Sequence, residues 1–177
     1  KGIFRVKPGF FYEIDIQNST FKENEYWKIP DILYGKVQSE NYYLEKLDFL
    51  LNKYIKSQMI SDVPIGVFLS GGLDSSLISS IANKYSQEPI NTFSVRFDEQ
   101  AYDESSKTKL MQSHINSNHH NITIKKKDFF NNFEKIIKIK DAPISIPHEY
   151  PLYELSKYMN GKVKVVLSGE GADEFFG

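Results

Sequence analysis

Cysteine is absent from this chain of 177 residues. The absence excludes disulfide bonds, thiolate metal sites and a cysteine nucleophile within these residues, and it is compatible with a cytoplasmic location. A long apolar run is also missing. The uncharged stretch from Val63 to Leu73 is too short to cross a bilayer, which needs about 20 residues. No secretory signal pattern is present, and we therefore expect no membrane partner.

An excess of either charge is missing as well, since 22 Lys and Arg residues face 23 Asp and Glu residues. A nearly neutral chain lacks the basic surface that holds nucleic acid by bulk charge, so we expect no nucleic-acid partner. The length allows one domain with a substantial core. Because the chain starts at Lys1 and stops at Gly177, just after an apparent helix start, we interpret it as a piece of a longer protein.

One strand-to-helix turn dominates the sequence. Three apolar residues, 67–69, are typical of a buried strand end, Ser70-Gly71-Gly72 of a turn, and a helical pattern follows from Asp74. Glycine tolerates positive φ and lets a ligand approach the backbone closely. A helix N-terminus after such a turn offers unpaired N–H groups and the positive end of the helix dipole. These features predict an anion site suited to phosphate.

The polar side chains of this turn refine the prediction. The hydroxyls of Ser70, Ser75 and Ser76 are potential donors to phosphate, whereas the carboxylate of Asp74 would repel it unless Mg²⁺ lies between them. No lysine follows Gly72, so the turn is not a Walker A loop, and it lacks the Gly-x-Gly-x-x-Gly spacing. The alternative is a glycine-rich turn that binds no ligand.

Apolar periodicity predicts alternating strands and helices over residues 41–177. Apolar runs predict strands at 65–69, 90–97, 119–124 and 163–167. Helical spacing of apolar residues predicts helices at 41–60, 75–85, 103–116, 129–140 and 148–160, with Asp128 as an N-cap. Before them we expect a β segment over residues 1–30, with strands at 3–6 and 11–16 and a polar connection at 17–25.

This order of elements predicts the α/β class, with a parallel sheet, helices on both of its faces and a short β segment before it. Ligands of such sheets bind at the carboxyl ends of the strands. A second glycine-rich loop, Ser168-Gly169-Glu170-Gly171-Ala172-Asp173, follows the last expected strand. Because both loops follow strand ends, we expect them to share one cleft.

The second loop brings two further carboxylates to this cleft. Glu170 stands between two glycines, where packing gives no reason for a charged residue, and it can accept a proton from an attacking amine or hold a metal or ribose. Asp173 can be a second Mg²⁺ ligand beside Asp74. The alternative is that Glu170 and Asp173 only form the acidic first turn of a helix.

The two loops together resemble those of glutamine-dependent asparagine synthetases, whose synthetase domain is of the ATP pyrophosphatase type. The residues that carry the resemblance are Ser-Gly-Gly-Leu-Asp-Ser-Ser at 70–76 and Leu-Ser-Gly-Glu-Gly-Ala-Asp-Glu-Phe-Phe-Gly at 167–177. The resemblance implies a fold like that of the adenine nucleotide alpha hydrolases. It also implies that residues 1–30 end a glutaminase domain, 31–40 form a linker, and 41–177 form a synthetase domain that is incomplete at its C-terminus.

The resemblance further implies ATP, Mg²⁺ and a small carboxylate acceptor, most typically aspartate. The acceptor attacks the α-phosphate, pyrophosphate leaves, and ammonia from glutamine displaces AMP from the acyl-adenylate. The implied pyrophosphate ligands are Ser70, Gly71, Gly72, Asp74, Ser75 and Ser76. The implied adenosine ligands are Leu69, Val95, Ser168 and Gly169. Asp74 and Asp173 are the implied Mg²⁺ ligands, and Glu170 is the implied catalytic residue.

One segment departs from the family pattern. Ile146-Pro147-His148 stands where many members carry Asp-Pro-Ser, on the expected acceptor side, so related enzymes that amidate sugar acids remain an alternative. A nucleotide-binding module without catalysis and another ATP pyrophosphatase are further alternatives. A homodimeric assembly also stays open. His114, His119 and His120 show no metal-ligand spacing and are expected to be structural.

Overall fold

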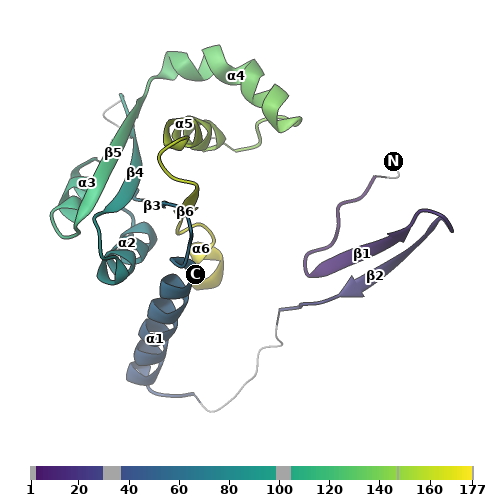
Figure 1. Ribbon diagram of the computed structural model, residues 1–177, viewed down its shortest axis with the longest axis horizontal. Coiled ribbons are helices and arrows are strands. Elements are labelled where there is room, and N and C mark those ends of the chain that lie inside the picture. Colours follow the sequence, from purple (N-terminus) through teal and green to yellow (C-terminus); the bar gives the residue numbers. More distant parts are fainter. Residues whose placement is uncertain (1–2, 30–36, 99–104, 147, 177) are drawn as a thin grey trace. The chain divides into compact units, whose positions relative to one another are not determined.

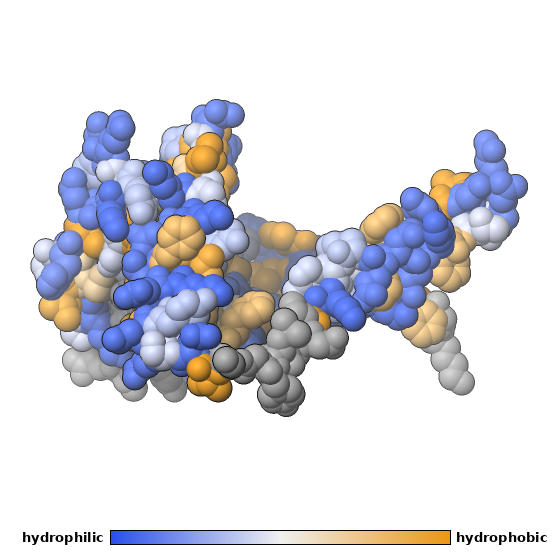
Figure 2. All heavy atoms as spheres, turned by 90° about the horizontal axis from the view of Figure 1, so that it is seen from below, coloured by the Kyte–Doolittle hydropathy of each residue, from blue (hydrophilic) through white to orange (hydrophobic). Residues whose placement is uncertain are grey.

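The computed structural model describes residues 3–29, 37–98, 105–146 and 148–176. The chain divides into two compact units, Lys1–Tyr43 and Leu44–Gly177 (Figure 1). Most of the expected linker, at residues 31–36, lies outside the described residues. Large apolar side chains are exposed on both units, as the orange spheres in Figure 2 show.

The first unit contains a β-hairpin. β1 (Phe10–Asp15) pairs antiparallel with β2 (Thr20–Glu25), so that Phe10 lies opposite Glu25. The prediction of a polar connection over 17–25 is therefore wrong for residues 20–25, and the predicted strand at 3–6 is not formed. The sequence did not indicate β2 because nearly all side chains of this strand are exposed. A half-buried strand is recognised by alternating apolar and polar residues, and β2 lacks this alternation.

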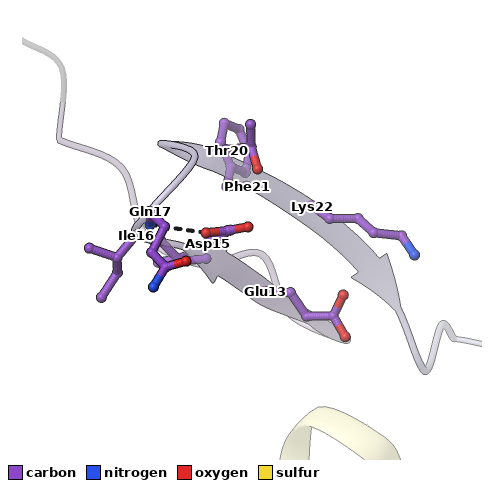
Figure 3. A pocket seen from close by; sticks show the side chains of 8 residues that line it. Glu13, Asp15, Ile16, Gln17, Thr20, Phe21 and Lys22 are labelled. Atoms are coloured by element: carbon purple, nitrogen blue, oxygen red, sulfur yellow. Dashed lines mark hydrogen bonds between the residues drawn. The ribbon is translucent and has the colours of Figure 1, made fainter.

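One face of this hairpin encloses a hollow of about 590 Å³. Glu13 and Lys22, which are partners in the strand register, line it together with Asp15, whose carboxylate accepts a hydrogen bond from the Gln17 N–H at 3.0 Å (Figure 3). Neither glycine-rich loop belongs to this unit. The hollow is therefore not the candidate site.

The second unit is an α/β fold around a four-stranded parallel sheet, as predicted. Its strands are β3 (Ile65–Phe68), β4 (Ile90–Phe97), β5 (Ser117–Ile124) and β6 (Val165–Leu167), in the spatial order β5-β4-β3-β6. Its helices are α2 (Leu73–Tyr85), α3 (Ser105–Gln112), α4 (Lys126–Lys140), α5 (Glu149–Met159) and α6 (Ala172–Phe176), and α1 (Glu40–Gln58) begins just before the unit boundary (Figure 1).

Helices cover both faces of the sheet, also as predicted. Val67 and Leu167 belong to a core cluster that includes residues of α1 and α2. The next residue of β3, Phe68, packs against the cluster formed by Phe93 and residues of α5. Successive side chains of a strand point to opposite faces, so these two clusters lie on opposite sides of the sheet.

Two expected helix boundaries differ in the structure. Asp128 is not an N-cap, because α4 begins at Lys126 and its N-cap is Lys125. Asp128 instead lies in the first turn, where a carboxylate also interacts favourably with the helix dipole. The expected helix at 103–116 is observed only as the shorter α3, and residues 103–104 are not among those described. None of the described helices is both long and apolar enough to span a membrane.

The strand order contains a reversal beside β3. The chain runs from β3 to β4 and β5 on one side, and then crosses back through α4 and α5 to place β6 on the other side of β3. Right-handed crossovers in opposite directions place their helices on opposite faces of a sheet. The reversal makes the carboxyl ends of β3 and β6 a topological switch point, the usual ligand site of open α/β sheets.

Candidate active site

The two glycine-rich loops meet at this switch point. We call Ser70–Gly72, after β3, the first loop and Ser168–Gly171, after β6, the second loop. A Cβ atom built on Gly169 would come within 2.9 Å of the Asp74 Cβ and 3.2 Å of the Ser75 nitrogen. The second loop therefore lies directly against the start of α2, and the two loops are neighbours, as a shared cleft requires.

The first loop leaves the N-terminus of α2 open. Gly71 has φ +84°, a conformation that favours glycine. Gly72 is the N-cap of α2 and provides no side-chain hydrogen bond. The Ser76 N–H donates to the Gly72 carbonyl at 3.1 Å, so the N–H groups of the preceding helical residues have no partner within the helix. This arrangement can bind an anion through backbone donors and the helix dipole.

Hydrogen bonds of two serine hydroxyls stabilise the first loop. The Ser75 Oγ accepts a hydrogen bond from the Ser70 N–H at 3.2 Å, donates to the Gly72 carbonyl at 3.2 Å and lies 2.8 Å from the Ser70 Oγ. The Ser70 Oγ in turn accepts the Gly72 N–H at 3.2 Å. Since Ser75 is buried, its hydroxyl shapes the loop, whereas Ser76 is only half-buried.

Two expected adenosine ligands, Leu69 just after β3 and Val95 in β4, can offer only backbone groups or part of a side chain. Leu69 is fully buried, and its N–H donates to the Phe93 carbonyl at 2.8 Å, which leaves the Leu69 carbonyl for other partners. The N–H and C=O groups of successive strand residues point to alternate edges of the strand. The N–H and C=O of Val95 therefore point to the same edge as those of Phe93. β3 pairs with β4 only as far as Phe93, and the backbone edge at Val95 is therefore not paired with β3.

The acidic residues of the site lie around the joined loops. Asp74 is half-buried in the first turn of α2, Glu170 is exposed in the second loop, and Asp173 is exposed in the first turn of α6. Among the described residues, no group of three or more His, Asp or Glu side chains is arranged to hold a metal ion. Two carboxylates fit Mg²⁺ that takes its remaining ligands from phosphates and water, the usual arrangement for this ion.

His114, His119 and His120 make contacts within the protein, in keeping with the structural role expected for them. The Nδ1 of His119 lies 2.9 Å from the Thr92 Oγ1 and its Nε2 lies 3.1 Å from the Ser94 Oγ. His120 stacks on Phe93 with ring centroids 4.9 Å apart. Burial lowers the pKa of both His119 and His120, since it disfavours the charged imidazolium. The Nδ1 of His114 lies 2.8 Å from the Leu110 carbonyl.

Sequence reasoning missed one residue that contacts the first loop. Thr108 of α3 is buried, and its Oγ1 donates to the Ser70 carbonyl at 3.3 Å. A Cβ atom built on Gly71 would come within 2.8 Å of the Lys107 Cβ and 3.0 Å of the Thr108 nitrogen. No local pattern marks Thr108, because the contact depends on how α3 packs against a loop far away in the sequence.

The segment that departs from the family pattern lines a cavity of about 930 Å³. Ile146 and His148 belong to its wall, whereas Pro147 is not among the described residues. The other lining residues are mainly apolar and include Phe97 and Ile124, the last residues of β4 and β5. The cavity therefore lies at the same carboxyl edge of the sheet as the two loops.

Known sequences identify the family. The asparagine synthase family model matches residues 46–177. The chain belongs to the asparagine synthase family. A putative glutamine-hydrolysing asparagine synthetase 2 of Methanocaldococcus jannaschii is 33% identical over 100% of the chain, which covers 34% of that protein. The glutamine-hydrolysing asparagine synthetase 1 of Bacillus subtilis is 39% identical over 70% of the chain, which covers 19% of it.

This asparagine synthase family chain thus spans about a third or less of the length of these relatives. Among solved structures, the NH3-dependent NAD synthetase of Campylobacter jejuni is similar, with a TM-score of 0.47 and 16% identity. That similarity covers 69% of this chain and 54% of the synthetase.

Proposed function

We propose that the protein carrying this segment catalyses the ATP-dependent amidation of a carboxylate. The observation that supports the proposal is the contact of Gly169 with Asp74, which joins the two glycine-rich loops at the switch point of the sheet. The joined loops combine a phosphate-type anion site with the carboxylates Glu170 and Asp173. Bare nucleotide binding does not require these carboxylates, whereas an amidation reaction can use Glu170 to accept a proton from ammonia and Asp173 to hold Mg²⁺.

Each part of the site has a proposed task. The open N-terminus of α2 and the first loop hold the pyrophosphate of ATP through backbone N–H groups, with Ser76 as a hydroxyl donor and Ser75 shaping the loop. Backbone groups of Leu69, Val95, Ser168 and Gly169 bind adenosine. Asp74 and Asp173 would hold Mg²⁺, which would neutralise charge on the pyrophosphate when bound.

The proposed reaction has two steps. An oxygen of the acceptor carboxylate attacks the α-phosphorus, and the bond to the β-phosphate oxygen breaks, so that pyrophosphate leaves and an acyl-adenylate forms. The nitrogen of ammonia then attacks the acyl carbon, AMP leaves with the bonding electrons, and an amide results. Glu170 accepts a proton that the adding ammonia must lose. In this proposal, glutamine is the source of ammonia, and residues 1–30 belong to the domain that hydrolyses it.

Aspartate is the acceptor we favour, because two similar relatives carry the name asparagine synthetase. A sugar acid is a second candidate. It is favoured by the departure at Ile146-Pro147-His148, since Ile146 and His148 line a cavity at the carboxyl edge where an acceptor can approach the nucleotide.

The test uses the full-length chain with ATP, Mg²⁺ and ammonium, and identifies the products by mass spectrometry. Amidation through an adenylate predicts AMP and pyrophosphate in equal amounts with the amide. Finding ADP and orthophosphate would contradict adenylate formation. Parallel reactions with aspartate and with uronic acid nucleotides identify the acceptor class. Nucleotide binding without turnover under any of these conditions would support the non-catalytic alternative.

A further inference from the structure

The backbone of Ser70 connects the first loop to two helices. The N–H of Ser70 donates to the Ser75 Oγ of α2, and its carbonyl accepts from the Thr108 Oγ1 of α3. α3 also packs tightly on the loop, since a Cβ built on Gly71 would come within 3.0 Å of the Thr108 nitrogen. Both polar groups of the Ser70 backbone are therefore fixed from outside the loop.

The hydrogen bond from Thr108 also orients the next N–H group along the chain. The carbonyl of Ser70 and the N–H of Gly71 belong to one planar trans peptide, in which the two groups point in opposite directions. When the carbonyl points to Thr108, the Gly71 N–H must point away from α3. This direction leaves the Gly71 N–H available to an anion bound in front of the loop.

Among the residues that the structure describes, no other hydrogen bond fixes the orientation of the peptide between Ser70 and Gly71. Glycine adopts positive and negative φ almost equally well, so a peptide plane that precedes glycine can rotate at low cost. Rotation would present a carbonyl oxygen, which repels phosphate, in place of an N–H donor. The hydroxyl of Thr108 is buried, so it needs an acceptor within the protein, and the Ser70 carbonyl supplies one.

We propose that Thr108 is a positioning residue for the phosphate site. It holds the Ser70–Gly71 peptide in the orientation that presents the Gly71 N–H to pyrophosphate, without touching the ligand itself. The identity of the ligand as the pyrophosphate part of ATP rests on the proposed function, whereas the orientation of the peptide does not.

The experiment compares variants that differ in the hydroxyl at this position, in the full-length protein. Thr108→Val keeps the shape and removes the hydroxyl, and Thr108→Ser keeps the hydroxyl. Thr123→Val, on an exposed position of β5, controls for a general effect of the substitution. We expect Thr108→Val to weaken the binding of inorganic pyrophosphate and of ATP by about three- to tenfold in calorimetry, the range that one hydrogen bond supports.

The control and the conservative variant should differ clearly from Thr108→Val. We expect Thr108→Ser to bind within about twofold of wild type and Thr123→Val to bind like wild type. In turnover, the KM for ATP should rise in Thr108→Val while the KM for the acceptor and kcat change little. If Thr108→Val fails to fold, the pair Thr108→Ala and Thr108→Ser, which also differs only in the hydroxyl, replaces it.

A second measurement separates this proposal from the proposed function. Amide hydrogen exchange of residues 70–73 in the ligand-free protein should be faster in Thr108→Val than in Thr108→Ser, whatever the enzyme binds. Equal exchange in the two variants overturns the positioning role. Faster exchange together with wild-type pyrophosphate affinity overturns it as well, because the loop then does not depend on Thr108 for binding. Absence of ATP binding in the wild type, with the exchange difference intact, contradicts only the proposed function.

Discussion

Gly169 packs against Asp74 so closely that a methyl group on Gly169 would come within 2.9 Å of the Asp74 Cβ. The two residues follow different strands, β6 and β3, which are neighbours in the sheet. Their contact places the second loop, which carries Glu170, beside the N-terminus of α2. The close packing of the second loop on the start of α2 therefore assembles the site.

The first prediction follows from this contact. Gly169→Ala should force the loops apart. The atoms nearest to the added methyl group are the Asp74 Cβ and backbone atoms of Asp74 and Ser75, which cannot move away easily. We expect ATP affinity to fall at least tenfold and stability to fall by about 1–3 kcal/mol, typical of overpacking. Calorimetry and urea unfolding measure the two effects.

A matched control separates the local effect from general destabilisation. Gly161 has φ +85° and no atom within 4 Å of an added Cβ. Gly161→Ala should therefore lower stability through backbone strain and leave ATP affinity unchanged. If both alanine variants bind ATP like wild type, the close contact of the two loops does not matter for the nucleotide.

The second prediction concerns Asp74, the half-buried acid of the first turn of α2. Asp74→Asn removes a proposed Mg²⁺ ligand and keeps the size of the side chain. We expect it to weaken ATP binding more with Mg²⁺ present than with the metal removed by a chelator. Calorimetry in the two conditions provides the comparison, and equal losses would exclude the metal role.

The third prediction concerns Glu170, which is exposed in the second loop. Glu170→Gln should keep ATP affinity within a few-fold, and it should reduce ammonia-dependent amide formation by about 10²–10⁴, the range for loss of general acid–base catalysis. Exchange of labelled pyrophosphate into ATP separates the two steps. Intact exchange with lost amidation assigns Glu170 to the ammonia step, and loss of both assigns it to adenylate formation. Normal amidation would show that Glu170 has no chemical role.

The fourth prediction concerns the hydrogen bonds that link Lys140, the last residue of α4, and Ser145 to Glu149, the first residue of α5. The Glu149 Oε1 accepts hydrogen bonds from the Lys140 Nζ at 2.5 Å and from the Ser145 Oγ at 2.7 Å. Lys140 and then Ser145 lower the pKa of Glu149 from 4.5 to about 2. A lowered carboxyl pKa means that the ionised form stabilises the fold above pH 4.5 and that this contribution is lost as the pH falls towards 2.

Lys140→Met should therefore raise the pKa of Glu149 towards 4.5, and Ser145→Ala should raise it by less. A carboxyl carbon NMR titration measures each value. Lys138→Met, an exposed lysine in the last turn of the same helix, is the matched control and should leave the titration unchanged. A wild-type midpoint near 4.5 would show that the network does not form in solution.

The fifth prediction concerns pH and the histidine in the sheet. Burial first, and the charge of His120 second, lower the pKa of His119 below 6.5. The unfolded chain then binds protons more readily than the folded one, so stability is fully present above pH 6.5 and falls as the pH drops below it. Urea unfolding at pH 7.5 and 5.5 should show this loss. His119→Gln should reduce this loss of stability, and the part that remains should come from His120, whose pKa burial also lowers.

Features that are local along the chain could be predicted from the residues alone. Apolar runs such as Val67-Phe68-Leu69 marked the buried strands because both faces of a parallel sheet are covered. Glycines and small polar residues after β3 and β6 marked the two loops, because a positive φ restricts the residue type at Gly71 and Gly171. The same local patterns carried the resemblance to the family.

The three-dimensional packing was needed to show which of these segments lie together. The pairing of β6 with β3 brings Gly169 to Asp74, and the packing of α3 brings Thr108 to Ser70. β2 was also recognisable only from its pairing, since its exposed side chains carry no alternation. Contacts between elements depend on crossover handedness and on the fit of buried faces, and a short stretch of sequence records neither of them.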